Sequence, residues 1–361
     1  MQASPAPTNP TLKVLYFGTY QRAYPRNAQV ISCLRGAGVE VDERNIDVWD
    51  EEGEGWRAGP REAIRLLGAE VKLFTRRPNG YDAVLVGYPG HLDLPAAKRA
   101  HAPVVFNPLV SLADTLVSDR GRFRSGSLPA RILTSIDRRA FRSADLVVAD
   151  TQAHGQFFAE LAGLEHVEVC FVGAEERVFQ PGWTPPRNFE ALFVGKLIPL
   201  QGVETILAAA ELDPDIPFRI VGSGQLEDLL ADHPVNVEHI PWVEYELLHG
   251  ELHAAGCALG IFGTGEKAQR VIPNKAFQAL ACGTPLITAD TPAARELLVH
   301  DESALLVPPG DPEALAEAIR RLVDDTELAR RIGAGGRAAY EQKASEAVLG
   351  QRWREIIESV L

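Results

Sequence analysis

The segment VIPNKAFQALACGTPLI, residues 271–287, gathers polar groups at the start of an apolar helix. Pro273 precedes the predicted helix, and Asn274, Lys275 and Gln278 occupy its first turns. A helix N-terminus exposes N–H donors and a partial positive charge, and the lysine adds a full charge, so this segment could bind an anion. Asn274 and Gln278 lie four residues apart and therefore share one face of the helix. Taken alone, the segment supports equally an anion site and an ordinary helix with a solvated first turn.

Two glycine turns follow strand-like runs earlier in the sequence. In ALFVGKLIPLQGVETILAAA, Gly195 and Lys196 stand at the carboxyl end of a predicted strand and before a helix. This strand–turn–helix arrangement can hold phosphate groups. In IVGSGQ, Gly222 and Gly224 mark a second turn after a strand. Each turn is weak by itself, because glycine also serves wherever a tight turn is needed.

Apolar runs alternate with helix-length amphipathic segments along the chain. We expect strands at Lys13–Gly18, Val39–Asn45, Ala83–Gly87, Val104–Phe106, Leu146–Ala149, Glu168–Val172, Ala191–Val194, Phe218–Val221, Val235–Ile240, Ala258–Phe262, Pro285–Ile287 and Ala304–Val307. The helices between them include Arg26–Gly36, Gly59–Gly68, Ala130–Arg142, Gln152–Leu161, Val203–Glu211, Glu244–Ala255, Asn274–Ala281 and Pro312–Asp324, and residues 326–361 are almost wholly helical. Apolar runs separated by helices are typical of parallel sheets that are covered on both faces.

The chain of 361 residues is long enough for two domains. A stretch rich in Pro, Gly and charge separates two sets of strands. The predicted fold class is α/β, with two Rossmann-like parallel-sheet domains facing each other across a cleft. We expect a disordered tail at 1–10, an N-terminal domain at 11–175, a linker at 176–189, a second domain at 190–340, and a C-terminal helix at 341–361 that packs back toward the first domain. Ligands of such sheets lie at the carboxyl ends of the strands.

The composition excludes several classes of function. Hydrophobic residues make up 46% and charged residues 24% of the chain, as in soluble globular proteins. No apolar run reaches the roughly 18 residues that a membrane span needs. The net charge of −13, carried mostly after residue 175, argues against nucleic-acid binding. The four cysteines have no metal-ligand spacing, so we expect a cytoplasmic protein with reduced cysteines and no bound metal.

One local segment departs from this acidic balance. RGRFRSGSLPARILTSIDRRAFR, Arg120–Arg142, contains seven arginines and a single acid, Asp137. As a basic amphipathic segment it could make a peripheral contact with anionic lipid at the inner face of a membrane. It could instead receive a ligand that carries phosphate or acid groups. A third reading is a solvated helix whose arginines pair with acids elsewhere in the fold.

The order of these elements resembles the C-terminal domain of the family 4-like retaining glycosyltransferases, the group 1 glycosyl transferases of the GT-B fold. The resemblance is carried by the Gly-Lys turn, the VGSG turn, IPW after the next strand, the PNK helix with ALACGTPLI, and ALLVPPGDPEALAEAI. It covers roughly residues 190–340. The N-terminal half matches by its architecture and by the linker VGAEERVFQP.

The resemblance implies transfer of a sugar from a nucleotide-diphosphate sugar, with retention of configuration and without a metal or cofactor. The acceptor would be a glycan, a lipid-linked molecule or a small molecule. The residues expected to bind the donor are Gly18, Gly195, Lys196, Gln201, Gly222, Gly224, Val243, Arg270, Asn274, Lys275 and Gln278. Those expected to take part in catalysis are His91, Lys196 and Glu266.

Four of these positions depart from the family pattern. The family has a lysine where Gln201 stands, a ring-side glutamate where Arg270 stands, and a ribose-binding glutamate where Gln278 stands. Lys196 replaces an arginine and so keeps the charge without the bidentate fork. We hypothesise that the diphosphate grip has moved to Lys275 and Arg270, and that Glu266 supplies the missing ring-side carboxylate.

The N-terminal half should hold the acceptor. FGTYQRAYPRN follows the first strand and carries Arg22 and Arg26, which are expected in the cleft unless they are simply solvated. Asn107 and Asp114 follow a later strand and are further candidates for acceptor binding. His91 stands just past a strand end, where family members often have a histidine that contacts the sugar, although a surface histidine would fit as well.

Other functions remain open at this point. The departures allow a degenerate nucleotide-sugar-binding protein that has lost catalysis. An epimerase or phosphorylase would share the architecture. A nicotinamide dehydrogenase is disfavoured, because YFGTYQRAYPRN lacks the three-glycine fingerprint after the first strand.

Overall fold

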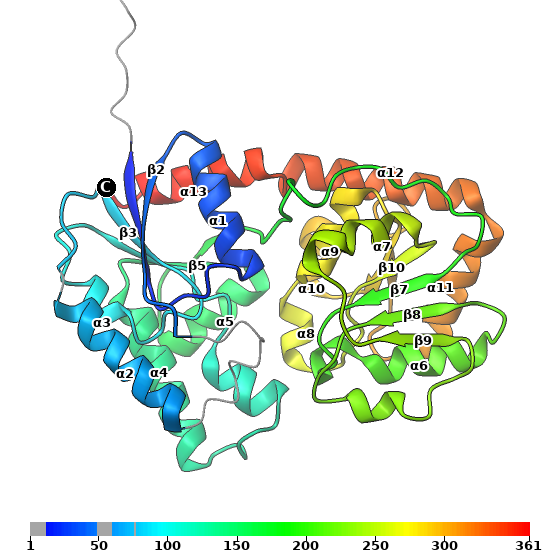
Figure 1. The fold of residues 1–361 in the computed structure, drawn as a ribbon, viewed down its shortest axis with the longest axis horizontal. Coiled ribbons are helices and arrows are strands. Elements are labelled where there is room, and N and C mark those ends of the chain that lie inside the picture. The colour runs from blue at the N-terminus through cyan, green and yellow to red at the C-terminus, as the bar shows by residue number, and fades with distance from the viewer. Residues whose placement is uncertain (1–11, 49–59, 76) are drawn as a thin grey trace, which may run out of the picture.

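A computed structural model describes residues 12–48, 60–75 and 77–361, apart from the side chains of residues 60–63. The predicted tail at 1–10 lies outside these residues. Two α/β domains stand side by side, joined by a linker and by the C-terminal helices that cross between them (Figure 1). Within the described residues, no helix is long and apolar enough to cross a membrane.

The N-terminal domain is built on one six-stranded parallel sheet in the order β2-β1-β3-β4-β5-β6. Its strands are β1 (Lys13–Gly18), β2 (Glu40–Asn45), β3 (Ala83–Val86), β4 (Val104–Phe106), β5 (Leu146–Ala149) and β6 (Glu168–Val169). The chain leaves β1 for β2 on one side and then returns to β3 on the other, so the strand order reverses between β1 and β3. The prediction of a parallel α/β sheet is confirmed here.

Helices cover both faces of this sheet because its central strands β1, β3, β4 and β5 are apolar on both faces. One face carries α1 (Pro25–Gly36) and the C-terminal helix α13 (Glu346–Glu358), whose Trp353 and Leu349 share a core with Leu34. The other face carries α2 (Pro60–Thr75), α3 (Leu94–Ala97), α4 (Leu128–Ser143) and α5 (Gln152–Ala162). Helix α4 begins where Ser127 accepts a hydrogen bond from the backbone N–H of Ala130.

The second domain repeats the plan in the order β12-β11-β10-β7-β8-β9. Its parallel strands are β7 (Ala191–Val194), β8 (Phe218–Val221), β9 (Val237–Ile240), β10 (Cys257–Leu259), β11 (Leu286–Ala289) and β12 (Leu305–Val307). Here the order reverses between β7 and β10. Ligands of open parallel sheets bind at such reversals, outside the carboxyl ends of the strands.

The helices of the second domain follow the predicted segments, with four short additions. The helices are η2 (Pro199–Gln201), α6 (Val203–Leu212), η3 (Glu227–Leu230), η4 (Tyr245–Leu247), α7 (Leu248–Ala254), α8 (Glu266–Arg270), α9 (Asn274–Cys282), α10 (Pro292–Leu297), α11 (Pro312–Asp324) and α12 (Thr326–Lys343). The four additions are η2, η3, α8 and α10. Asp311 caps α11 by accepting from the N–H of Ala314, and Gly283 ends α9 in the left-handed conformation.

The chain crosses between the domains twice, and the two crossings are bonded together. Glu176, in the first crossing, accepts hydrogen bonds from the Tyr340 hydroxyl at 3.1 Å and from the Glu346 N–H at 3.0 Å. Helix α13 then packs along α1, and the C-terminus lies on the N-terminal domain (Figure 1). The linker at Glu176 and the segment between α12 and α13 therefore connect the two domains side by side.

We predict that Trp353→Ala destabilises the N-terminal domain, because Trp353 is fully buried between α13 and α1. Truncating a buried tryptophan to alanine typically costs about 3–5 kcal/mol. Urea unfolding followed by circular dichroism measures the loss, with Val348→Ala on the exposed side of α13 as the control. A loss similar to that of the control would show that α13 contributes little to this core.

Candidate functional site

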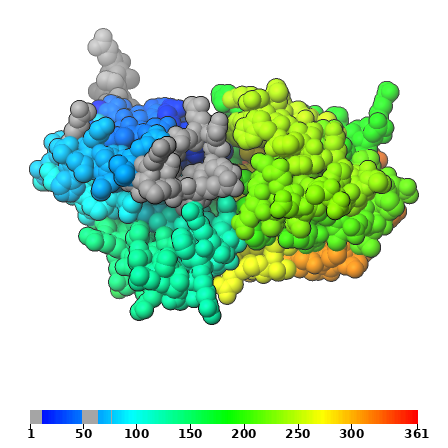
Figure 2. Space-filling model, turned by 60° about the horizontal axis from the view of Figure 1, so that its bottom comes forward, coloured from blue at the N-terminus to red at the C-terminus, as the bar shows by residue number. Residues whose placement is uncertain are grey.

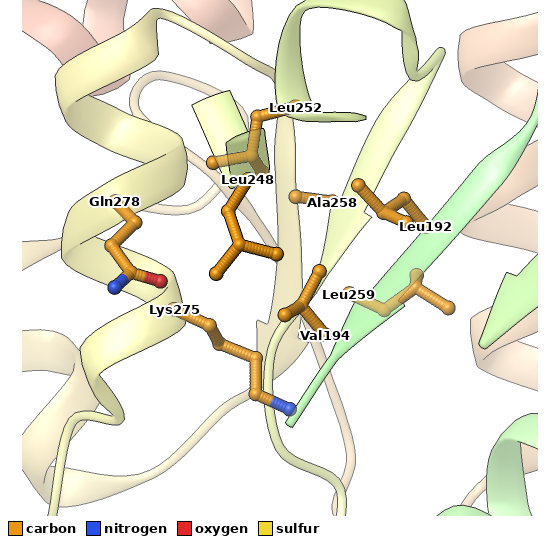
Figure 3. A pocket seen from close by; sticks show the side chains of 8 residues that line it. All are labelled: Leu192, Val194, Leu248, Leu252, Ala258, Leu259, Lys275 and Gln278. Carbon is orange, nitrogen blue, oxygen red and sulfur yellow. The ribbon is translucent and has the colours of Figure 1, made fainter. Parts of the chain in front are cut away.

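A small cavity marks the strand-order reversal of the second domain (Figure 3). It is lined by side chains of β7, β10, α7 and α9: Leu192, Val194, Ala258, Leu259, Leu248, Leu252, Lys275 and Gln278. Its volume of about 10 Å³ is roughly enough for one water molecule. A larger ligand would therefore have to lie outside this cavity.

Lys275 points its amine from α9 toward the carboxyl end of β7 (Figure 3). The Nζ atom lies 3.3 Å from the centre of the Phe193 ring, and a Cβ placed on Gly195 would be only 3.0 Å from it. The amine is buried and has no hydrogen-bond partner among the described residues. Burial lowers the pKa of Lys275 well below its ordinary value. Lys275 is thus a buried amine without a hydrogen-bond partner among the described residues, placed beside a glycine turn.

The start of α9 adds donors to the same place. Pro273 occupies the position before the first helical residue, and no side chain caps this end of the helix. An uncapped helix start leaves backbone N–H groups without partners and carries a partial positive charge. Asn274 is half-buried at this end, and Gln278 is buried one turn further on, beside the cavity. The predicted grouping of Asn274, Lys275 and Gln278 therefore exists in the fold.

The two glycine turns pack directly against each other. A Cβ on Gly222 would lie 1.9 Å from the carbonyl oxygen of Gly195, so this position accepts only glycine. The N–H groups of Gly195, Leu197 and Gly222 are bonded to the carbonyls of Val221, Ser223 and Ile240. These three backbone donors are therefore already used within the protein. The start of α9 adds a partial positive charge to this place, and Lys275 adds a full charge when its amine is protonated.

The other residues of the second domain that were predicted to bind the donor differ in how far their side chains are exposed. Lys196 is exposed on the turn after β7, and Val243 is half-buried in the loop after β9. Gln201 is buried in η2, where its Oε1 atom has no partner among the described residues. Gly224 lies beside the backbone of Leu197, where a Cβ would come within 2.7 Å of the carbonyl oxygen.

Helix α8 connects the second domain to the first by ion pairs. The Nη2 atom of Arg270 lies 2.9 Å from Oδ1 of Asp114, which begins the π-helix η1 (Asp114–Asp119) of the N-terminal domain. Lys267 donates to the Thr115 hydroxyl at 2.8 Å and lies 3.6 Å from Asp119. Arg270 also covers the Phe157 ring, with its guanidinium carbon 3.9 Å from the ring centre. These contacts hold the two domains together on the side away from the paired crossings.

Lys267 and Asp119 were missed by the sequence analysis. Lys267 is buried, and burial lowers its pKa while Asp119 opposes the shift. The two residues stand far apart in the chain, and no local spacing links them.

On the N-terminal side, Gly18 ends β1 at the strand-order reversal. A Cβ there would lie 2.0 Å from Oδ2 of Asp93, which accepts a hydrogen bond of 2.8 Å from the N–H of Thr19. Burial raises the pKa of Asp93, and burial together with the neighbouring Asp93 raises the pKa of Glu70 to about 9. Gly18 thus allows a buried carboxyl group to approach the loop, a role that the sequence analysis did not foresee.

Comparison with known proteins identifies the second domain. Residues 175–339 match the family model described as glycosyl transferases group 1. The C-terminal domain of this chain belongs to the group 1 glycosyltransferases. The chain is also 31% identical over 173 residues to a phosphatidyl-myo-inositol mannosyltransferase of Mycobacterium leprae, an alignment that covers 45% of each protein. The chain spans about half the length of the first curated relatives that it matches.

Solved structures extend the match in fold to the whole chain. Sucrose-phosphate synthase from Thermosynechococcus elongatus superposes with a TM-score of 0.75 at 18% identity, covering 97% of this chain and 98% of that one. HepE from Anabaena, solved in complex with UDP-glucose, superposes with a TM-score of 0.69 at 18% identity over 97% and 99% of the two chains. The two-domain GT-B architecture predicted from the sequence is therefore confirmed.

Within this glycosyltransferase fold, several predicted residues of the N-terminal domain prove to be internal. Arg26 is fully buried and donates to the side-chain oxygen of Asn107 and to the carbonyls of Cys170 and Phe171. Asn107 is fully buried as well. The expectation that Arg26 and Asn107 face the cleft is wrong, because they bind each other and the backbone inside the domain. Arg22 remains exposed but pairs with Glu43 through two bonds of 2.6 and 2.9 Å.

His91 is also directed into the domain interior. Its ring packs against Phe106 and Phe141, at centroid distances of 5.2 and 5.8 Å, and its Nε2 atom lies 3.4 Å from Asp137. Burial lowers the pKa of His91, and Asp137 opposes the shift. The prediction that His91 contacts the sugar as a catalytic residue is not supported, since the ring is buried in the core.

Glu266, in the second domain, and Asp114, in the N-terminal domain, were both predicted to belong to the site, but their surroundings differ. The Glu266 side chain is 91% exposed and lies 3.7 Å from Arg270, so it projects into solvent at the start of α8. Asp114 is buried, with one oxygen on Arg270 and the other without a partner among the described residues. The expectation that Arg270 joins the diphosphate grip is corrected, because its guanidinium is bound to Asp114.

We predict that Lys275→Met stabilises the ligand-free protein against unfolding. The substitution replaces a buried amine that has no partner among the described residues with an apolar side chain of similar length. Burying an unpaired polar group costs about 1–3 kcal/mol by mutational measures. Thermal unfolding at neutral pH should show a gain of several degrees. The gain should shrink as the pH rises toward the ordinary lysine value of 10.5, where the unfolded chain also loses the proton.

The exposed Lys72 supplies the control, since Lys72→Met should leave stability nearly unchanged. A lower melting temperature for Lys275→Met would mean that the amine has a stabilising partner in the free protein.

A second prediction concerns the pair between the domains. Arg270→Leu should destabilise by about 3 kcal/mol, because it leaves Asp114 buried without its cation. Arg270→Leu combined with Asp114→Leu should recover much of that loss, since no buried charge then remains. Urea unfolding of the two variants measures the difference. Equal losses in the single and double variants would show that the ion pair is not coupled across the interface.

Proposed function

We propose that this protein is a glycosyltransferase that takes its sugar from a nucleotide-diphosphate sugar bound by the second domain. The observation that carries the proposal is the buried, unpartnered amine of Lys275 at the uncapped start of α9. A diphosphate supplies the anion that this amine and the helix start lack. The position at the β7–β10 reversal is where an α/β sheet binds such ligands.

The relatives support a donor of this class. HepE of Anabaena was solved with UDP-glucose, and the first curated relative, from Corynebacterium glutamicum, is described as GDP-mannose-dependent. Because these names differ in base and sugar, they support a nucleotide-diphosphate sugar without selecting one. Gln278 lines the cavity one helical turn after Asn274, and we propose that its amide hydrogen-bonds a ribose hydroxyl of the donor.

The proposed chemistry demands positioning and charge balance from the protein. The bond between the anomeric carbon and the diphosphate oxygen breaks, and its electrons pass to the diphosphate. The oxygen of an acceptor hydroxyl forms the new bond to the anomeric carbon with retention, and its proton passes to the leaving diphosphate. The ammonium of Lys275, the start of α9 and the exposed Lys196 would balance the negative charge as it develops. These cations fit a metal-independent reaction that needs no cofactor. The acceptor, a glycan, a lipid-linked molecule or a small molecule, would approach from the N-terminal domain.

A donor-binding protein without catalysis is a second candidate, which the geometry at α8 favours. Arg270 stands where the family has a ring-side glutamate and is held by Asp114, and the Glu266 carboxylate is exposed to solvent. The ring-side carboxylate expected from the family is therefore missing at both positions. Turnover separates the two candidates: a transferase should hydrolyse or transfer the sugar slowly even without its natural acceptor, whereas a binding protein should show affinity alone. Proton NMR of the transferred sugar tests retention at the anomeric carbon.

We predict that thermal unfolding against nucleoside diphosphates and their sugar conjugates reveals one preferred base. A ligand at a hundred times its dissociation constant stabilises by about 2.7 kcal/mol. Lys275→Met should abolish this ligand-induced shift even though the variant is itself more stable. Lys196→Ala should weaken binding by about 1.5–3 kcal/mol, the scale of a charged hydrogen bond, and Gln278→Glu should preserve or improve it.

Val235→Ser, at a fully exposed position of the same domain, is the matched control. The proposal fails if no nucleotide shifts the wild type, or if Lys275→Met binds as well as the wild type does.

A further inference from the structure

The outer layer of the N-terminal domain carries an apolar stripe that no other described element covers. Ile64, Leu67, Val71 and Phe74 recur along α2 at helical spacing and are between 47% and 71% exposed. Leu73 and Ala69, on the opposite side of the same helix, are buried toward the sheet. Helix α2 therefore has one apolar face for the domain core and a second one turned outward.

Basic side chains border this stripe on α2 and near its end. Lys72 is exposed on α2, and the exposed Arg99 places its guanidinium carbon 4.4 Å from the ring centre of Phe74. An exposed apolar stripe bordered by cationic side chains is the pattern of a helix that lies in a membrane interface.

Helix α4, in the same layer, presents a basic face. Arg131, Arg138 and Arg142 lie along one side of α4 at helical spacing, and all three are exposed, as is Arg139. Two large apolar side chains, Leu128 and Ile132, are exposed beside them. The short helix α3 contacts both α2 and α4, so the two faces belong to one layer of the domain (Figure 1). In Figure 2 the blue-green segment 120–142 forms the lower edge of the N-terminal domain, next to the blue and cyan surface of the segments before it.

We propose that the outer faces of α2 and α4 form a docking surface for a membrane with anionic lipid headgroups. The stripe on α2 enters the headgroup–acyl boundary, and the arginines of α4 contact phosphate groups beside it. Charge favours lipid over a second copy of this chain, because two copies joined through the stripe would bring like-charged arginine faces together. This inference does not depend on the proposed function, since it concerns the opposite end of the N-terminal domain from the Lys275 site.

The structure also refines the predicted role of Arg120–Arg142. The carbonyl of Arg120 accepts a hydrogen bond from Gln225 of the second domain, and its guanidinium lies 3.8 Å from the neighbouring Asp119 of the N-terminal domain. Arg138 and Arg142 each donate one hydrogen bond to the end of α5 while remaining exposed. The lipid contact therefore belongs to α4 rather than to the whole segment, and its apolar part comes from α2.

Flotation with vesicles tests the proposal on the full chain. The wild type should float with vesicles of phosphatidylcholine and phosphatidylglycerol and much less with phosphatidylcholine alone. Leu67→Ser with Val71→Ser should lower the partition coefficient about tenfold or more, because two apolar anchors are lost. Arg131→Gln with Arg139→Gln should lower it about 25-fold at low salt, at roughly fivefold for each charge, and the effect should diminish as salt is added.

Matched control variants are Val235→Ser and Arg331→Gln, both at exposed positions of the second domain, which should float as the wild type does. Circular dichroism of each variant checks that the fold is intact. Sedimentation velocity tests the alternative, in which the stripe binds a second copy of the chain. A wild-type dimer that dissociates in the Leu67→Ser, Val71→Ser variant, together with no flotation of the wild type, would overturn the proposal. A monomeric wild type that does not float would overturn it as well.

Discussion

The site depends on one buried polar group that has no hydrogen-bond partner among the described residues, the amine of Lys275, which lies against Phe193 at the end of β7. Isolated polar groups in an interior are costly, and folded proteins usually give them a partner. Here the neighbouring strands and α7 supply only apolar side chains, so the amine is left facing the glycine turn. The Lys275 amine lies where open parallel sheets bind their ligands. An anion from outside the protein could therefore supply the partner that the amine lacks.

The rest of the second domain keeps this place open. Gly195 and Gly222 let the loops after β7 and β8 approach each other closely, and their N–H groups are spent on holding those loops together. The start of α9, which has no capping side chain, adds a partial positive charge at this place. The guanidinium of Arg270 is bound to Asp114 at the domain interface, whereas the amine of Lys275 has no hydrogen-bond partner among the described residues.

The sequence predicted the strands of both domains closely, because buried parallel strands are apolar throughout and the helices between them are amphipathic. Short elements such as α3, α8 and α10 escaped, since a helix of four to six residues shows too little periodicity. The grouping at the start of α9 was predictable because helical spacing fixes it locally. Arg26, Asn107 and His91 were misplaced because sequence position near a strand end does not say whether a side chain turns toward the cleft or into the core. The partners Asp114 and Arg270 are 156 residues apart, and only the fold brings them together.

The protonation state of Lys275 tests the central claim most directly. Burial lowers its pKa, so the free protein should hold a neutral amine at a pH where exposed lysines are charged, and a bound diphosphate should restore the proton. Affinity for the diphosphate should therefore fall as the pH rises. NMR of protein labelled at the lysine side-chain carbons, assigned with Lys275→Met, can follow this group with and without a nucleoside diphosphate. We expect the signal of a neutral amine in the free protein and of an ammonium in the complex. A Lys275 signal that is unchanged by every nucleoside diphosphate would contradict the account.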